Sequence, residues 1–172
     1  MKNNIILIGF MGCGKSSIGI RLSYTLKKTI IDTDKWIEKK QNMSIPEIFE
    51  KRGEEAFRQM ETECLRQLIP ASDNQIIATG GGLPVREENH ALLKQLGRVY
   101  YLRVTPEAVY ERLKGDDTRP LLQVEEPMVR IRELLGRREA SYRKCADAVI
   151  ETSQRDFDEI ISEIIEKEKE AK

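Results

Sequence analysis

The residues near the amino terminus carry the clearest chemistry in this chain. The run Gly9-Phe10-Met11-Gly12-Cys13-Gly14-Lys15-Ser16 fits the pattern G-x-x-x-x-G-K-[ST] of a phosphate-binding P-loop. Its glycines let the backbone wrap around an anion, and the helix that follows adds the positive end of its dipole. Lys15 is placed to reach the outer phosphates and the Ser16 hydroxyl to hold Mg²⁺. The pattern predicts binding of a nucleoside triphosphate; the alternative is a glycine-rich turn without a ligand.

Two carboxylates and a second glycine cluster follow the next two predicted strands. Asp32 and Asp34 lie two residues apart, so their side chains share a side if the extended conformation persists. One carboxylate near Ser16 would help to hold Mg²⁺, and the other would accept a proton from a substrate hydroxyl. The turn Gly80–Gly82 would offer N–H donors to a small ligand. The alternatives are a polar turn with Asp34 as helix N-cap, and a merely flexible glycine turn.

Two arginines are candidates for binding anions. Arg58 suits a two-pronged contact with a carboxylate or phosphate, and Glu61 could orient it from the same helix face. The alternative is an ordinary ion pair within the helix. Arg119 lies in the polar segment 114–122, which has the length of a mobile lid that would exclude water and bring an arginine to the phosphates. The alternative there is a polar surface loop.

The elements that must position these residues follow from hydrophobic periodicity and helix signals. We expect strands at residues 5–8, 29–32, 75–79, 98–104 and 148–151. We expect helices after the P-loop, around residues 36–37, from Ser44 to Pro70 with Gly53 inside, through 92–96, from Thr105 to 114, from Pro127 to Cys145, and over 157–165. Strand followed by helix five times predicts one α/β domain over 1–172, a parallel sheet with helices on both faces in three layers. The carboxyl ends of its strands would bring the three clusters to one crevice.

The bulk composition excludes several classes of function. Lys plus Arg and Asp plus Glu both number 29, so no overall field favours nucleic acid. No apolar run approaches the roughly 20 residues that span a bilayer, and no signal peptide is evident. The three cysteines have no metal-ligand spacing and indicate reduced thiols in a cytoplasmic protein. Nothing requires a partner subunit, so we expect a monomer.

Taken together, the motifs resemble the shikimate kinase family over nearly the whole chain. They are the P-loop, Asp32-Thr33-Asp34, Gly53-Glu54-x-x-Phe57-Arg58-x-x-Glu61, Ala78-Thr79-Gly80-Gly81-Gly82, Arg119-Pro120-Leu121-Leu122 and Arg138-Glu139-x-x-Tyr142. The resemblance implies a nucleoside monophosphate kinase-like P-loop fold with five parallel strands in the order 2-3-1-4-5. It also implies transfer of the γ-phosphate of ATP to the 3-hydroxyl of shikimate, in the route to aromatic amino acids.

The resemblance also implies a role for each matched residue. Lys15, Asp34 and Arg119 would be catalytic, with Asp34 as the base. Ser16 and Asp32 would lie at the Mg²⁺. The helices at about 33–61 would bind the substrate and residues 114–124 would form the lid. The implied nucleotide-binding residues are Gly12, Cys13, Gly14, Lys15, Ser16, Ser17, Arg112, Arg119 and Arg155. The implied shikimate-binding residues are Asp34, Arg58, Gly80, Gly81, Gly82 and Arg138.

The sequence also supports expectations for Cys13, His90 and Trp36, and it leaves two alternative functions to be weighed. Cys13 is expected either to pack or to be an acidified, oxidation-prone thiol at a helix N-terminus. His90 is expected at the surface, and Trp36 to pack or to wall the acceptor pocket. One rival is another small-molecule P-loop kinase such as gluconate kinase, which Asp32, Asp34, the glycine triplet and the two arginines disfavour. The other is a regulatory nucleotide-binding protein, which the intact P-loop lysine and serine disfavour.

Overall fold

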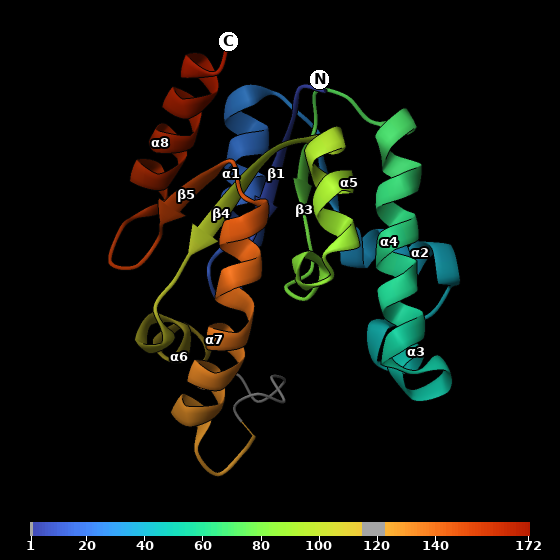
Figure 1. The fold of residues 1–172 in the computed structure, drawn as a ribbon. Coiled ribbons are helices and arrows are strands. Elements are labelled where there is room, and N and C mark those ends of the chain that lie inside the picture. The colour runs from blue at the N-terminus through green and yellow to red at the C-terminus, as the bar shows by residue number, and fades with distance from the viewer. Residues whose placement is uncertain (1, 115–122) are drawn as a thin grey trace.

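The five strands form one parallel sheet in the order β2-β3-β1-β4-β5 (Figure 1). The protein is represented by a computed structural model, which describes residues 2–114 and 123–172. The strands are β1 (Asn4–Ile8), β2 (Ile30–Asp32), β3 (Ile76–Ala78), β4 (Gly97–Arg103) and β5 (Ala148–Glu151). All five positions, the parallel pairing and the strand order confirm the sequence-based expectations.

Strand β1 lies at the centre of the sheet and explains its parallel character. All five of its residues are buried, so the strand is covered on both faces, as in sheets that have helices on each side. Ile5 is in register with Ile76 of β3 on one side and with Arg98 of β4 on the other. The run of aliphatic residues that precedes the P-loop therefore fixes the P-loop at the middle of the sheet's edge.

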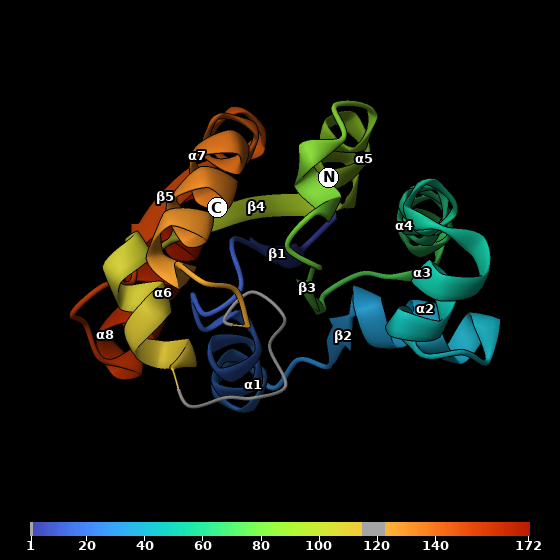
Figure 2. The same cartoon turned by 90° about the horizontal axis from the view of Figure 1, so that it is seen from below.

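Helices cover both faces of the sheet (Figures 1 and 2). Helices α1 and α8 pack together on one face, and α5 and α7 lie on the other. A group of three helices, α2, α3 and α4, extends from the β2 edge, where α4 also contacts α5. The helices are α1 (Lys15–Leu26), α2 (Thr33–Gln41), α3 (Ile45–Arg52), α4 (Glu54–Ala71), α5 (Glu88–Leu96), α6 (Pro106–Leu113), α7 (Pro127–Cys145) and α8 (Phe157–Glu170), with the 3₁₀ turn η1 (Leu83–Val85).

Side-chain caps set several of these helix starts. The Ser44 hydroxyl accepts a hydrogen bond from the Glu47 N–H at 3.3 Å, which confirms Ser44 as the predicted cap. The Glu47 carboxylate reaches back to the Ser44 hydroxyl rather than to the Ser44 N–H of a full capping box. Thr105 caps α6, whose first residue is a proline. The expected continuous helix from Ser44 to Pro70 is wrong, because Gly53 adopts φ 87° and ψ 168° and separates α3 from α4. A side chain is rarely tolerated at that φ, so glycine permits the break.

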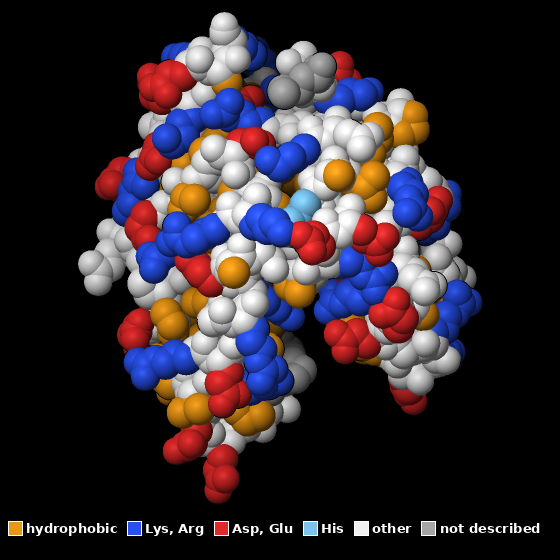
Figure 3. All heavy atoms as spheres, in the orientation of Figure 1, with side chains coloured by type: hydrophobic (Ala, Val, Ile, Leu, Met, Phe, Trp, Pro, Cys, Tyr) orange, Lys and Arg blue, Asp and Glu red, His pale blue; other side chains and the backbone are white. Residues whose placement is uncertain are grey.

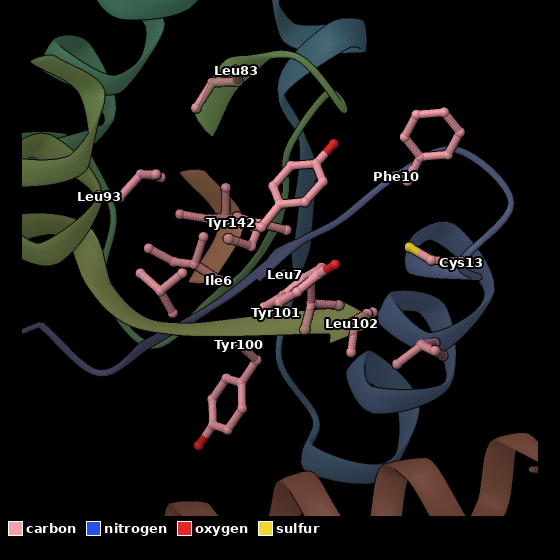
Figure 4. Close-up of a cluster of buried hydrophobic side chains, with 14 of the residues drawn as sticks. Ile6, Leu7, Phe10, Cys13, Leu83, Leu93, Tyr100, Tyr101, Leu102 and Tyr142 are labelled. Carbon is pink, nitrogen blue, oxygen red and sulfur yellow. The ribbon is translucent and has the colours of Figure 1, made fainter. Parts of the chain in front are cut away.

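Strand β4 shows how the sheet presents large side chains to both layers (Figure 4). Tyr100 and Tyr101 are adjacent, fully buried and point to opposite faces. Each hydroxyl donates to a carboxylate, Tyr100 to Glu168 and Tyr101 to Glu139. Buried hydroxyls need such partners, so the two pairs fasten α8 and α7 to opposite faces of the same strand.

The expectation of a surface histidine is wrong. His90 is 9% exposed, and its Nε2 lies 2.6 Å from the carbonyl oxygen of Pro84. Periodicity alone did not reveal that η1 folds back over the start of α5. His90 instead helps to hold η1, and with it the turn that follows β3.

Among residues 2–114 and 123–172, no helix combines the length and apolar character needed to cross a bilayer.

Asn4 joins three parts of the chain at the edge of the sheet opposite the P-loop. Its side chain is 1% exposed, donates to the Leu96 carbonyl at 2.8 Å, and accepts from the Gln75 N–H at 2.9 Å. It also lies 3.2 Å from the Ser72 hydroxyl oxygen. Removal of this side chain would leave buried backbone groups without their partners.

We therefore expect Asn4→Ala to lower the free energy of unfolding by about 2–4 kcal/mol. Urea denaturation measures this loss. Asn3→Ala is the matched control, because Asn3 is exposed and its hydrogen bonds come from its backbone. Equal stability of the two variants would contradict the assigned role of the Asn4 amide.

Candidate active site

A cavity of about 530 Å³ opens at the carboxyl ends of the strands. Figure 2 views the sheet from this side, and Figure 3 shows a deep notch between the α6–α7 side and the α2–α4 side. The cavity is lined by the P-loop, by the start of α2, by α4, by the turn after β3 and by α7. Polar clusters that are far apart in the sequence therefore share one space, as the sequence predicted.

The P-loop forms one wall of the cavity. Gly12 and Gly14 have φ values of 80° and 94°, in the left-handed region that favours glycine. Helix α1 begins at Lys15, and Gly14, its N-cap, provides no side-chain cap. The backbone N–H groups in the first turn of α1 lie at the end of the helix that faces the cavity, and no capping side chain among the described residues accepts their hydrogen bonds. Such N–H groups are suited to bind phosphate.

Lys15 and Arg112 provide positive charge at this wall. The Lys15 ammonium donates to the carbonyl oxygens of Gly9 at 2.5 Å and Phe10 at 3.2 Å. The Arg112 guanidinium donates to the Gly12 carbonyl at 2.7 Å and to the Thr152 carbonyl at 3.0 Å. Arg112 thus ties α6 to the P-loop and to the segment after β5.

The glycine turn after β3 is packed against three of the side chains predicted to form the site. A Cβ atom at Gly80 would lie 2.7 Å from Asp34 Oδ1, and one at Gly82 would lie 2.4 Å from Arg58 Nη1. At Gly81 it would lie 3.3 Å from Arg138 Nη1. These distances support the interpretation that glycine at these positions lets the three side chains approach the backbone closely.

Arg58 is held by a buried carboxylate one turn along α4. Its Nη1 lies 2.7 Å from Glu61 Oε1, and the Glu61 side chain is 1% exposed. Burial raises the pKa of Glu61 to about 7, although the Arg58 charge and hydrogen bond oppose the rise. Within the described residues, Glu61 Oε2 is buried and has no hydrogen-bond partner. Arg58 is therefore oriented by a carboxylate that faces the cavity, as the sequence suggested.

Asp34 faces the same cavity with an unpaired oxygen. Its Oδ1 is buried and has no hydrogen-bond partner within the described part of the chain. Burial raises the pKa of Asp34 above its ordinary value, the nearby Asp32 raises it further, and Lys15 opposes the rise. A buried carboxylate with a raised pKa and a free oxygen can accept a hydrogen bond and then a proton from a hydroxyl.

Arg138 approaches the cavity from α7, on the side opposite Arg58. Its guanidinium lies 5.6 Å from the centre of the Phe10 ring. No carboxylate in the described residues forms an ion pair with it. Arg58 and Arg138 can therefore hold an anion between them, with Asp34 beside it and the P-loop across the cavity.

The profile of one family, described as shikimate kinase, matches residues 11–169 of this chain. The chain belongs to the shikimate kinase family. It is 45% identical over 162 residues to a shikimate kinase of Thermodesulfovibrio yellowstonii, covering 94% of this chain and 92% of that protein. It is also 45% identical over 152 residues to one of Nitrosospira multiformis, covering 88% and 77%. The structure of an Acinetobacter baumannii shikimate kinase in complex with shikimate has a TM-score of 0.90 and 39% identity, covering 100% of this chain and 96% of that one.

The structure brings together most residues that the resemblance to shikimate kinases assigned. Arg155 is not among the described residues that line the cavity; its guanidinium bonds the Glu151 carbonyl at 2.9 Å and Glu163 at 2.7 Å. Cys13 is fully buried in the core, which supports packing rather than an exposed thiol. Arg119 and residues 115–122 of the predicted lid lie outside the described residues. The predicted residues that line the cavity are Gly12, Gly14, Lys15, Ser16, Ser17, Asp32, Asp34, Arg58, Gly80, Gly81, Gly82, Arg112 and Arg138.

The carboxylates Asp32 and Asp34 differ from the extended arrangement expected from sequence. Helix α2 begins at Thr33, directly after β2, and Asp32 rather than Asp34 is its N-cap. Asp32 Oδ1 accepts from the Asp34 N–H at 2.9 Å and from the Lys35 N–H at 3.2 Å. The cap leaves Asp34 in the first turn, where its side chain reaches the glycine turn.

Sequence reasoning did not find several apolar residues that line the cavity, among them Ile45, Phe57, Leu113 and Phe157. Of these, Phe157 lies against the P-loop, 3.2 Å from where a Cβ atom at Gly14 would be. The sequence predicts a helix at each of these residues, but hydrophobic periodicity cannot distinguish a residue in the core from one that lines a cavity. Trp36 packs against the hydrophobic core, as one of the two expectations had it, and lines two hollows beside the main cavity.

We expect Gly82→Ala to displace the Arg58 guanidinium and raise the KM for shikimate about tenfold, the scale of one lost charge-assisted contact. Gly82 has φ −91°, which alanine adopts freely, so the free energy of unfolding should change by less than about 1 kcal/mol. Steady-state kinetics and urea denaturation measure both quantities. Gly136→Ala is the matched control, because a Cβ there meets nothing within 4 Å. An unchanged KM in Gly82→Ala would contradict the steric role.

The pKa of Glu61 makes stability depend on pH. Burial raises this pKa from 4.5 to about 7, so the folded protein favours the neutral form of Glu61. The contribution of Glu61 to the free energy of unfolding is therefore fully present below pH 4.5 and is lost as the pH rises through 7. We expect the wild type, relative to Glu61→Gln, to lose on the order of 3 kcal/mol between pH 4.5 and 8. Urea denaturation across this range measures the difference. Glu63→Gln, on the exposed side of α4, is the control, and parallel curves for the wild type and Glu61→Gln would contradict the burial effect.

Proposed function

We propose that this protein is a shikimate kinase that transfers the γ-phosphoryl group of ATP to the 3-hydroxyl of shikimate, giving ADP and shikimate 3-phosphate for aromatic amino acid biosynthesis. Membership of the family and the shikimate complex of a 39% identical relative support this reaction. The observation that carries it is one cavity with a P-loop on one wall and Arg58, Arg138 and Asp34 on the other.

The acceptor would be gripped by its carboxylate. Arg58 on α4 and Arg138 on α7 approach the cavity from opposite sides, and planar guanidinium groups match a carboxylate in two-pronged geometry. The backbone of Gly80–Gly82 lies between them and would contact the ring hydroxyls. A cyclic acid with several hydroxyls fits this set of groups better than a nucleoside monophosphate, whose phosphate would need more arginines.

Asp34 would act as general base. Its unpaired Oδ1 would accept a hydrogen bond from the reacting hydroxyl and take its proton as the new oxygen–phosphorus bond forms. The bond between the γ-phosphorus and the bridging oxygen breaks in the same transfer, leaving ADP. The raised pKa of Asp34 favours proton acceptance in this environment.

The donor half would hold ATP through backbone and basic groups. Gly12–Ser17 would cradle the phosphates, with Lys15 moving from the Gly9 and Phe10 carbonyls to the outer phosphate oxygens. Arg112 would flank the adenine beside Gly12. The corresponding roles of Arg155 at the adenine and of Arg119 on the phosphates stay predictions.

The residues at the P-loop wall fit Mg²⁺. Ser16 and Asp32 both line the cavity, and the N-cap bonds of Asp32 use only its Oδ1. Mg²⁺ prefers oxygen ligands and keeps several waters, so two protein oxygens suffice beside the phosphates. When bound, Mg²⁺ would neutralise charge on the phosphates; Ser16 and Asp32 would orient it.

We also propose the organisation in which this reaction occurs. The chain would be one domain that acts as a monomer in the cytoplasm, with small-molecule substrates and neither nucleic acid nor membrane as a partner. Residues 33–61 would be the acceptor-binding helices, and residues 114–124 the lid.

An assay of ADP release that offers shikimate, gluconate and nucleoside monophosphates tests the proposal. Turnover with shikimate is expected, and turnover with gluconate alone would instead support the rival kinase. A chain that binds ADP but turns over none of these acceptors would support the regulatory rival.

We expect Asp34→Asn to lower kcat at least about 100-fold, the usual scale for loss of a general base, with unchanged ADP affinity. Steady-state kinetics and calorimetric titration with ADP measure the two effects. Asp158→Asn is the control, because that carboxylate is exposed at the start of α8. Near-normal kcat in Asp34→Asn would remove Asp34 as the base.

A further inference from the structure

The hydrogen-bond ladder between β2 and β3 stops where the active site begins. Ile30, Ile31 and Asp32 are in register with Ile76, Ile77 and Ala78. Thr33, which follows β2 directly, is the first residue of α2, so its backbone leaves the sheet. The turn that continues from β3 keeps a backbone bond to β1, from the Thr79 N–H to the Leu7 carbonyl, but β2 supplies no backbone acceptor for the Gly80 N–H.

The side chain of Thr33 replaces that partner. The Gly80 N–H donates to Thr33 Oγ1 at 3.0 Å, and Thr33 is fully buried. A buried N–H without an acceptor is costly, so this bond fixes the turn to the start of α2. Thr33 is the middle residue of Asp32-Thr33-Asp34, and the chemistry of the two carboxylates leaves it without a role.

The same bond determines how the base and the turn face each other. Asp34 follows Thr33 directly, and a Cβ atom at Gly80 would lie 2.7 Å from Asp34 Oδ1. That oxygen has no hydrogen-bond partner within the described residues. Because no direct bond joins Asp34 to the turn in the part of the chain that the structure describes, the distance between Asp34 and the Gly80–Gly82 turn is set by the backbones of α2 and of the turn. The Thr33 hydroxyl joins these two backbones.

We propose that Thr33 is a positioning residue for phosphoryl transfer: its hydroxyl holds the Gly80–Gly82 turn at the start of α2 and so sets the place of the acceptor relative to Asp34. This inference rests on the proposed function. The hydrogen bond that the Thr33 hydroxyl accepts comes from the Gly80–Gly82 turn, and Thr33 is not among the described residues that line the cavity, so we expect its effect in the acceptor half of the site.

Two comparisons isolate the effect of the Thr33 hydroxyl: wild type with Thr33→Val, and Thr33→Ser with Thr33→Ala. Thr33→Val replaces it with a methyl group of similar size, whereas Thr33→Ser and Thr33→Ala both lack the methyl group and differ only in the hydroxyl. We expect Thr33→Val and Thr33→Ala to lower kcat/KM for shikimate about tenfold or more, the scale of one buried unpaired N–H, through both kcat and KM. Thr33→Ser should stay close to wild type. The KM for ATP and the affinity for ADP should be unchanged in all three.

The outcomes separate this inference from its rivals. If Thr33→Ser loses as much as Thr33→Ala, the methyl group rather than the hydroxyl matters and the inference is overturned; near-normal kinetics in Thr33→Val overturn it as well. If Thr33→Val does not fold, the comparison of Ser with Ala still decides. A general loss that includes ADP affinity marks structural damage and also overturns it. Failure of the proposed function would appear separately, as absence of shikimate turnover in the wild type.

Discussion

The acceptor side of this site depends on close contact between a backbone turn and three side chains. Gly80, Gly81 and Gly82 lie so near Asp34, Arg138 and Arg58 that added Cβ atoms would overlap or crowd them. Each of the three side chains comes from a different helix, and the turn between them follows β3, the strand next to the central β1. The turn is thus the common reference against which Asp34 and the two arginines are positioned.

Much of the fold could be predicted because its signals are local and strong. The buried run of β1, the Ser44 cap and the proline at the start of α6 each specify an element within a few residues. The P-loop and the carboxyl-end rule then predicted which clusters meet. The strand order came from resemblance to the family, since periodicity does not specify which parallel strands are neighbours.

What the sequence could not reveal depends on contacts between elements. Whether Asp32 or Asp34 caps α2 is decided by where β2 ends, and both residues are good caps. His90 is buried because η1 folds over α5, and no property of its own neighbours indicates this. Phe57 and Phe157 have the periodicity of core residues, and only the packed structure shows that they line a cavity.

The two arginines that line the cavity beside the glycine turn belong to opposite sides of the notch. Arg58 is carried by α4, whose group of helices continues from the three-residue edge strand β2, and Arg138 is carried by α7 (Figures 2 and 3). A carboxylate held by both would act as a non-covalent cross-link between these parts. Local opening of the α2–α4 group would then require release of the acceptor, so the acceptor opposes that opening by mass action. Amide exchange in α2 to α4 should therefore report occupancy of a site that most of those amides never touch.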